Sequence, residues 1–479
     1  MAETHSRLSL GVKAAYGFGS VAYGVKNNGF DYFLLLFYSQ VMGLDARLVG
    51  IAITTALVFD ALSDPIVGYW SDNLRSKLGR RHPFMYAAAL PVALSYFFLW
   101  NPPVDWSETA MFWYLLVLAV FIRTFITAYE TPSSALAPEL TDDYLERSSL
   151  LSFRYYFGWT GGNTMTVMMF FFIFPALASS AHPDGRFNPA SYEILGIVGS
   201  LLIFASILVS AIGTHSQIPH LRQPPPKRTL TLGGVFKEIF ETLANRSFVS
   251  LFSAALLGAI ATGLAAALSF YFYTYFWEFS SVETGIITMG VFLAAVIGFV
   301  LAPIVTRRFG KRNGAMGIGL VAFLGAPLPV FLRLIGVLPE NGEPFVFWFV
   351  FVTGVLDVGL IICFQILFAS MTADLVEQAE LKTGRRSEGV FFSSVTFVRK
   401  AVQGLGLMMA SLVLALAEFP SGADVSEVSD EAVWHLGAYY VPTILALWMG
   451  MIAVISGYKL NADEHEANLA QLKTNRQAS

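Results

Sequence analysis

Charged residues are scarce in this sequence, since Asp, Glu, Lys and Arg together make up only 13% of its 479 residues. Soluble globular domains carry about 25% charged residues, so this composition excludes the ordinary soluble classes. Hydrophobic residues supply 55% of the chain, and its mean hydropathy is +0.59. The composition is that of an integral membrane protein.

Cysteine is almost absent, because Cys363 is the single one in the chain. One cysteine excludes an intrachain disulfide and a multi-cysteine metal site, and we expect Cys363 to be a small buried residue of a helix. The sequence also lacks the series of alternating segments, each about ten residues long, that forms a transmembrane barrel. Of the two classes of membrane-spanning protein, the helical class therefore remains.

Apolar segments of at least about 18 residues recur along the whole chain, each long enough to cross a hydrocarbon core roughly 30 Å thick as a helix. We predict an all-α membrane protein with twelve transmembrane helices. Their approximate ranges are 13–42, 46–72, 83–101, 110–135, 149–178, 193–213, 247–277, 284–305, 313–336, 346–374, 388–419 and 434–459.

Most of the 30 Lys and Arg residues fall on one side of this topology. The positive-inside rule then places both termini in the cytoplasm, and we expect the inner membrane of a bacterium as the location. A basic, proline-rich segment separates the first six helices from the last six. We predict an N-terminal half at 1–213, a cytoplasmic linker at 214–246, a C-terminal half at 247–460 and a cytoplasmic tail at 461–479.

The two halves share a short repeat, because the Pro-Ile-Val tripeptide at 65–67 recurs at 303–305. Repeated six-helix halves around a central polar site are typical of secondary transporters. Aligned on this tripeptide, Asp60 and Asp64 of the first half correspond to glycine and alanine in the second. The two carboxylates therefore belong to one half only.

Asp60 and Asp64 lie one helical turn apart and share a face of the second predicted helix. A carboxylate at membrane depth costs several kcal/mol unless it is protonated, paired or hydrated, so these acids are candidates for a cation site. Glu130 in the fourth helix is a third acid, and the following Pro132 would leave a backbone carbonyl free nearby. The alternative for Asp64 is an ion pair with the basic loop that follows.

Basic residues within the predicted helices are candidate countercharges for these acids. Each of them either contacts a substrate or pairs permanently with an acid of the protein. They are Lys26, Arg123, Arg154, Arg399 and Lys400.

A second charged group is predicted at the cytoplasmic ends of the helices. Opposite charges on the two halves can form a gate, because a network that breaks in each cycle can bias a balanced equilibrium. Its members are Asp72, Arg80, Arg81, Asp374, Glu377, Arg385 and Arg386.

Four motifs together resemble those of a known family. They are D-x-x-x-D-P-x-x-G-x-x-x-D at 60–72, YGFGS at 16–20, E-x-P at 130–132 and ADLVEQAELKTGRRSEG at 373–389. This combination is similar to the glycoside–pentoside–hexuronide:cation symporters of the major facilitator superfamily. The resemblance implies that fold, and symport of a sugar, glycoside or uronate-like solute with H⁺ or Na⁺ by alternating access.

The resemblance also assigns residues. Asp60, Asp64 and Glu130 match the cation-site acids of the family, and Thr127 falls near that site. Arg154 and Lys400 match basic residues that bridge to the sugar or to the cation site. It implies no organic cofactor, and no metal ion apart from Na⁺ as the coupling ion.

Some positions depart from the family pattern. Gly24 stands where one member of the family has a sugar-binding aspartate, and Ser134 and Gln365 stand where that member has tryptophans that line its sugar pocket. The added polar residues of the first half favour another substrate, one with an anionic group. The expected substrate contacts are Lys26, Asp31, Arg123, Arg154, Gln365, Thr396 and Lys400.

Alternatives to a sugar symporter remain open. Lysophospholipid symporters are similar to the same broader family, so a lysophospholipid or another anionic amphiphile is one alternative substrate. A membrane prenyltransferase, which binds Mg²⁺-diphosphate through D-x-x-x-D motifs, is a remote alternative because the second half lacks a matching motif. A receptor or scaffold would not need the acids.

We expect a transporter and not an enzyme, active as a monomer in the lipid bilayer, with a small solute and a monovalent cation as partners and no nucleic acid.

Overall fold

The computed structural model describes residues 8–141, 144–221, 246–383, 402, 404–423 and 427–457, and none of these residues is in a β-strand. The chain divides into two compact units. Unit 1 comprises Met1–Arg228, Ala266–Tyr271 and Pro420–Glu427, and unit 2 comprises Thr229–Ala265, Phe272–Phe419 and Val428–Ser479. The division at 228 and 229 falls inside the predicted linker 214–246, of which residues 222–245 lie outside the described ranges.

The first predicted span is helical but interrupted, whereas the sequence predicted one continuous helix over 13–42. Two segments within it are π-helical, which widens the turn by one residue and is often found at functional sites. In chain order its parts are α1 (Leu10–Phe18), α2 (Val21–Asn28), the π-helix η1 (Gly29–Phe33), α3 (Leu34–Leu36) and the π-helix η2 (Phe37–Val41).

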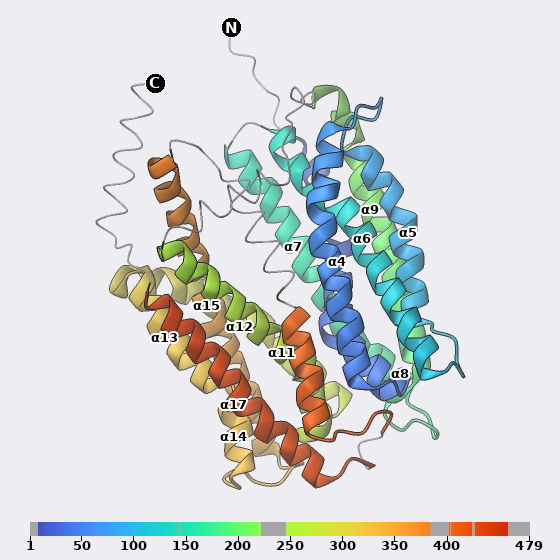
Figure 1. Ribbon diagram of the computed structural model, residues 1–479, viewed down its shortest axis with the longest axis vertical. Helices are drawn as coiled ribbons and strands as arrows, with labels where there is room; N and C mark the ends of the chain where they lie inside the picture. The colour runs from blue at the N-terminus through green and yellow to red at the C-terminus, as the bar shows by residue number, and fades with distance from the viewer. Residues whose placement is uncertain are drawn as a thin grey trace. The chain divides into compact units, whose positions relative to one another are not determined.

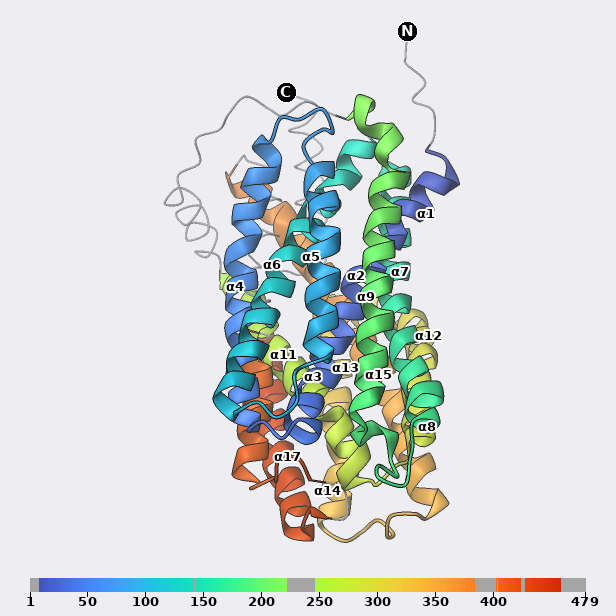
Figure 2. The same cartoon turned by 90° about the vertical axis from the view of Figure 1, so that its right-hand side faces the viewer.

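Four long helices form the rest of the framework that carries the site in unit 1. They are α4 (Ala46–Asn73), α5 (His82–Trp100), α6 (Glu108–Leu140) and α9 (Pro189–Gly213). Figure 1 shows α4 alongside α6, and Figure 2 shows α5 between α6 and α9, in agreement with their contacts. The Ser107 hydroxyl caps α6 by accepting a hydrogen bond from the Ala110 amide. Helix α6 ends at Leu140, beyond the predicted end at 135.

The fifth predicted span consists of α7 (Tyr144–Met168), the π-helix η3 (Met169–Ile173) and α8 (Phe174–Ala176). Helix α7 contacts α2 along its length. The two helices approach most closely at Gly24, where an added Cβ atom would lie 2.0 Å from the Gly158 carbonyl oxygen. Gly24 is therefore a position of close helix packing, and not a cavity position at which a carboxylate has simply been lost.

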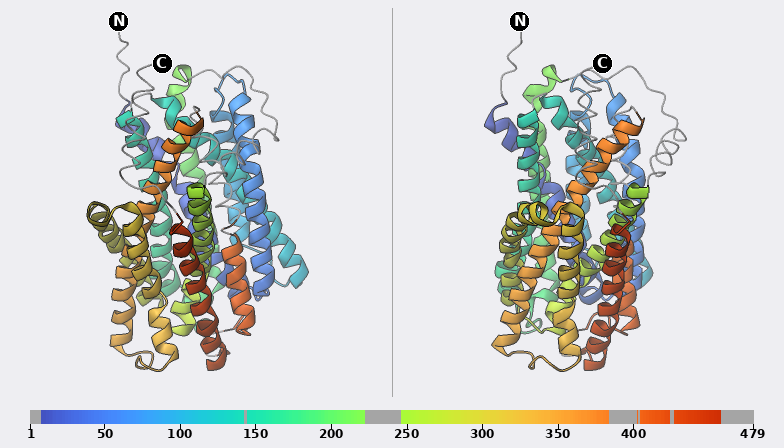
Figure 3. Two further views of the ribbon diagram at one scale, coloured as in Figure 1. Left: turned by 60° about the vertical axis from the view of Figure 1, so that its left-hand side comes forward. Right: turned by 90° about the vertical axis from the view of Figure 1, so that its left-hand side faces the viewer.

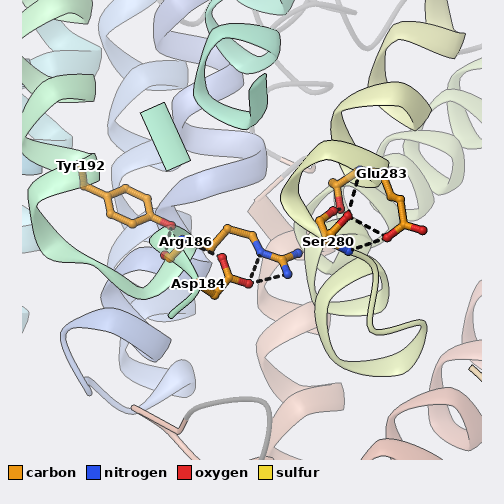
Figure 4. A network of polar contacts seen from close by, with 6 residues as sticks. Asp184, Arg186, Tyr192, Ser280 and Glu283 are labelled. Carbon is orange, nitrogen blue, oxygen red and sulfur yellow. Dashed lines mark hydrogen bonds and ion pairs between the residues drawn. The ribbon is translucent and has the colours of Figure 1, made fainter. Parts of the chain in front are cut away.

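Two short helices flank α9: the 3₁₀-helices η4 (Gly185–Phe187) before it and η5 (His215–His220) after it. In the loop before α9, Arg186 pairs with the Asp184 carboxylate, and the Tyr192 hydroxyl donates to the Arg186 carbonyl at 2.9 Å (Figure 4). These contacts fix the entry of the chain into α9.

The Lys13 ammonium ties α1 to α7, because it lies 3.0 Å from the Glu146 carboxylate. Burial raises the pKa of Glu146, but hydrogen bonds from Lys13, the Thr141 hydroxyl and the Leu8 amide outweigh burial and lower the pKa from its ordinary value. This carboxylate therefore holds three segments together in its ionised form.

Unit 2 contains the other helices of the described residues. They are α11 (Arg246–Tyr271, with its last residues in unit 1), the π-helix η6 (Phe272–Phe276), α12 (Ser281–Phe309), α13 (Lys311–Gly325), α14 (Leu328–Leu334), α15 (Pro344–Thr383), a helical segment at 404–416 and α17 (Asp430–Ile455). Helix α15 (orange in Figure 3) contacts both α12 and α13. A capping box of Ser280 and Glu283 begins α12 (Figure 4).

The ninth predicted span, 313–336, is not one helix. Helix α13 ends at Gly325 and α14 begins at Leu328. Pro327 and Pro329 cause the break, because a proline has no N–H to donate to the carbonyl four residues earlier. The carbonyl oxygens of Phe323 and Gly325 therefore lack their usual helical donor.

Nine helices of the described residues are long and apolar enough to cross a membrane. Helical segments also occupy the other three predicted spans, at 10–41, 144–176 and 404–416. The first of these is divided by π-turns, and α7 carries polar side chains such as Arg154 and Asn163. The structure thus agrees with a helical, multi-pass membrane protein, and twelve crossings stay a prediction.

We expect Gly24→Ala to lower the melting temperature of the purified protein, because its methyl group would force α2 away from α7. Thermal unfolding in detergent measures this effect. Gly11→Ala in α1 is the matched control, since its added Cβ would meet only the Ser9 hydroxyl, at 3.9 Å. Equal melting temperatures for the two variants would contradict close packing at Gly24.

Candidate functional site

Asp60 is the centre of a polar cluster between α4 and α6. Its side chain is buried, with 2% exposure, in a helix that is apolar enough to cross a membrane. The Thr127 hydroxyl donates to Asp60 Oδ1 at 2.6 Å, and Arg123 Nη1 donates to Oδ2 at 3.3 Å. Both carboxylate oxygens are thus engaged by one neighbouring helix.

The spacing in α6 explains this arrangement. Arg123 and Thr127 are four residues apart, so they lie one turn apart on the face that contacts α4. A charge buried in this environment is tolerated only with a partner, and the Asp60–Arg123 pair satisfies that condition. The sequence predicted Arg123 as a candidate countercharge for the acids of the site, and in the structure its partner is Asp60.

The guanidinium of Arg123 is incompletely satisfied. Its carbon lies 4.8 Å from the centre of the Phe30 ring, a cation–π distance. Its Nε atom is buried without a hydrogen-bond partner in the described part of the chain. Arg123 therefore has an unused donor next to the ion pair.

Asp64 continues the same face one turn later. The Thr131 hydroxyl donates to Asp64 Oδ1 at 3.3 Å, and the aspartate is half-buried. Two acids four residues apart on α4 therefore face three α6 residues, Arg123, Thr127 and Thr131, at the same spacing. Thr131 was not predicted, although this four-residue repeat was the signal that could have identified it.

Glu130 belongs to a neighbouring group. In the described part of the chain no hydrogen bond or ion pair joins it to Asp60 or Asp64. It interacts electrostatically with Arg154 and with the Tyr23 phenol. The structure therefore brings together two of the three predicted acids and places the third beside Arg154.

Arg154 of α7 is held by α6. Its Nη1 donates to the Ser133 hydroxyl at 3.0 Å and its Nη2 to the Ser134 hydroxyl at 2.7 Å, and the side chain is 7% exposed. The guanidinium carbon also lies 5.4 Å from the centre of the Tyr23 ring. Ser134, which the sequence aligned with a tryptophan of the family pattern, thus holds Arg154 in place.

The other predicted substrate contacts are dispersed or lie outside the described ranges. Lys26 is buried on α2, Asp31 is half-buried on η1 and Gln365 is exposed on α15. Residues Thr396 and Lys400 lie outside the described residues. Their roles stay predictions.

Two of the predicted gate residues bind within unit 1. Arg80 Nη2 and Arg81 Nε each lie 2.8 Å from Glu139 Oε1, and Arg81 Nη1 also donates to the Ser71 hydroxyl at 2.7 Å. Glu139, at the end of α6, was not singled out from the sequence. The described structure does not include Arg385 and Arg386, or the side chains of Asp72, Asp374 and Glu377.

Comparisons with known proteins agree with this architecture. The family model described as MFS/sugar transport protein matches residues 15–462. The putative glycoside/cation symporter YagG of Escherichia coli is 23% identical, covering 99% of this chain and 97% of its own. The sphingosine-1-phosphate transporter MFSD2B of Mus musculus is 26% identical, covering 94% of this chain and 90% of its own.

A solved structure shows the same fold. A bacterial homologue of the iron transporter ferroportin superposes with a TM-score of 0.62 at 15% identity, covering 94% of this chain and 99% of its own. This similarity concerns the arrangement of helices alone.

We expect the buried pair to behave as a unit in a double-mutant cycle. Arg123→Met leaves Asp60 buried without its countercharge, which typically costs about 3–5 kcal/mol, and adding Asp60→Asn should recover part of that loss. The melting temperatures of the two single variants and the double variant measure the coupling. Asp184→Asn, on the loop before α9, is the control and should be additive with Arg123→Met. If the double variant lost as much stability as the sum of the losses of Arg123→Met and Asp60→Asn, the two residues would not interact.

Proposed function

Because the chain belongs to the family of MFS/sugar transport proteins, we propose that it carries a sugar, glycoside or uronate-like solute across the membrane together with H⁺ or Na⁺. It is a multi-pass membrane transporter and not an enzyme. Transport proceeds by alternating access, and both termini lie in the cytoplasm, as the basic loops predict.

The observation that carries this proposal is the buried Asp60 carboxylate with two donors from α6. A cation that binds Asp60 neutralises it and weakens its attraction to Arg123. Since Arg123 has a buried donor without a partner among the described residues, its guanidinium can take another acceptor. Cation entry at Asp60 is thereby linked to anion binding at Arg123.

This arrangement favours H⁺ over Na⁺ as the coupling ion. A proton needs only one carboxylate oxygen, whereas Na⁺ needs several oxygen ligands around it. Arg123 nitrogen already occupies one side of Asp60, and the Thr127 hydroxyl directs its proton at the other side. Protonation can break the ion pair without rebuilding the cluster.

The same charges support a substrate with an anionic group. Arg123 and Arg154 are both buried in unit 1, and buried basic groups need acidic partners. Protonation of Asp60 removes the partner of Arg123, so a carboxylate or phosphate of the substrate can replace it. We therefore favour a uronate or an acidic glycoside over a neutral sugar.

A lysophospholipid or another anionic amphiphile is the second candidate substrate. It is supported by the similarity to MFSD2B, whose name assigns it a phosphorylated lipid. It is also supported by the exposed aromatic side chains that follow Arg154 on α7, Tyr155, Tyr156 and Trp159. A phosphate near Arg154 would leave an acyl chain free to lie against these rings.

Gradient-driven uptake into proteoliposomes tests the coupling. Each charge that crosses 100 mV supplies about 2.3 kcal/mol, enough for roughly 50-fold accumulation. Asp60→Asn should abolish accumulation and retain exchange of labelled solute, because it removes the cation's binding group but not the solute's. Asp105→Asn, in an exposed loop, is the control. Full concentrative uptake by Asp60→Asn would refute the assignment, and H⁺ and Na⁺ gradients applied separately identify the ion.

Competition distinguishes the substrate classes. We expect an acidic disaccharide to displace bound label more strongly than its neutral analogue does, and Arg123→Gln to remove that preference. Binding of a labelled disaccharide, its uronate analogue and a lysophosphatidylcholine to the purified protein measures this. Displacement by lysophosphatidylcholine alone would favour the amphiphile, and equal affinity for the neutral and acidic sugars would contradict the anionic substrate.

A further inference from the structure

Asp357 is a membrane-embedded acid of unit 2 that the proposed coupling site does not use. It lies on α15 within the candidate membrane span Pro344–Phe368. At 1.5 Å per residue it is about 20 Å along the helix from Pro344 and about 16 Å from Phe368. The carboxylate is therefore near the middle of the span, and the sequence analysis did not identify it.

The Asp357 carboxylate lies against the break between α13 and α14. Its Oδ1 atom is 3.0 Å from the position that a Cβ atom of Gly325 would occupy. Gly325 is the last residue of α13, and its carbonyl and that of Phe323 cannot receive helical hydrogen bonds from Pro329 and Pro327. The acid thus faces a segment of helix whose backbone acceptors are not committed to the helix.

The groups around Asp357 do not include a cation in the described part of the chain. Its electrostatic neighbour among the described residues is the phenol of Tyr440 on α17, and Tyr440 in turn interacts with Tyr273 of η6. The charged residues of the packed helices lie toward the helix ends: Glu283, Arg307 and Arg308 on α12, Lys311 and Arg312 on α13, and Arg333 on α14. Arg333 is engaged, since its Nη1 donates to the Pro339 carbonyl.

This environment favours the neutral carboxylic acid. An ionised carboxylate at membrane depth needs a cation or water, and phenols and apolar helices supply no positive charge. A carboxylic acid, in contrast, has one O–H to donate, and the acid lies next to the break between α13 and α14, where the carbonyls of Phe323 and Gly325 lack their usual helical donors. The break also allows α13 and α14 to move relative to each other, which would change the access of water to this acid.

We propose that Asp357 is a second proton-binding site, which exchanges one H⁺ with water when the α13–α14 break moves. The step is a simple protonation: the carboxylate accepts one H⁺ to become a carboxylic acid and later loses it. The site is separate from Asp60, because it lies in the other unit and has no arginine partner among the described residues. Its role in the cycle rests on the proposed transport function, but its protonation does not.

Infrared spectroscopy of the full-length protein in lipid vesicles tests the site directly, with the proton itself as the ligand. The wild type should show the absorption of a protonated carboxyl group at neutral pH, and Asp357→Asn should lose it. Asp430→Asn, an exposed acid at the start of α17, should retain it. Because asparagine resembles the neutral acid in shape and charge, Asp357→Asn should keep the wild-type melting temperature.

Two results would overturn the site. One is a neutral-pH carboxyl absorption that is unchanged in Asp357→Asn. The other is a large loss of melting temperature in Asp357→Asn that Asp357→Glu does not show, together with no protonated-carboxyl absorption in the wild type at neutral pH. That second result would mean a permanently ionised aspartate held by a cation beyond the described residues.

The pH profile of labelled-disaccharide and labelled-uronate uptake tests the functional role. On the alkaline side of the profile, each required proton makes the uptake rate fall about tenfold per pH unit. Asp357→Asn requires one proton fewer, so its uptake rate should fall less steeply, by one such factor of about ten per pH unit. Superimposable profiles for the wild type and Asp357→Asn would exclude Asp357 from the transport cycle. If the wild type accumulates neither probe, the proposed function fails for these substrates, whereas the infrared measurement still decides whether Asp357 binds a proton.

Discussion

The pairing of Asp60 with Arg123 joins α4 to α6 within two candidate membrane spans, and the proposed binding chemistry depends on it. In water such a pair would contribute little, but its two side chains are buried in helices that are apolar enough to cross a membrane. Neither charge can be left alone there without a large cost. A change that neutralises Asp60 therefore leaves Arg123 in need of a new partner, and this need is the basis of the proposed link between cation and solute binding.

The hydroxyl groups around the charged residues make such an exchange feasible. Thr127 and Thr131 each donate to an aspartate, and Ser133 and Ser134 each accept a hydrogen bond from Arg154. A hydroxyl can donate or accept as required, so it can follow a change of charge without being left unsatisfied. Helix α6 supplies all four hydroxyls, and so it is the element that connects the predicted cation site to the predicted substrate contact.

Breaks in the helices lie close to the charged residues of both units. Asp31 is on a π-helical turn of the first span, and Asp357 lies against the proline break between α13 and α14. Backbone groups freed at such breaks can bind ions or protons at membrane depth, where a continuous helix has none to offer. The acids of the two units differ in their surroundings: Asp60 is paired with Arg123, whereas the neighbour of Asp357 among the described residues is the Tyr440 phenol.

The sequence by itself determined the helical membrane class and the ranges of most spans, and it identified Asp60 and Asp64 as candidates, because hydropathy and the cost of intramembrane charge are local properties. Spacing along one helix could not decide partners on another helix. It left Arg123 as a candidate partner for any of the three acids, whereas tertiary packing brought Arg123 to Asp60 of α4 and Glu130 toward Arg154. Alignment could not show that Gly24 is needed for close packing against Gly158. These contacts depend on how the helices turn toward one another, and side chains from distant parts of the chain decide that only when the bundle forms.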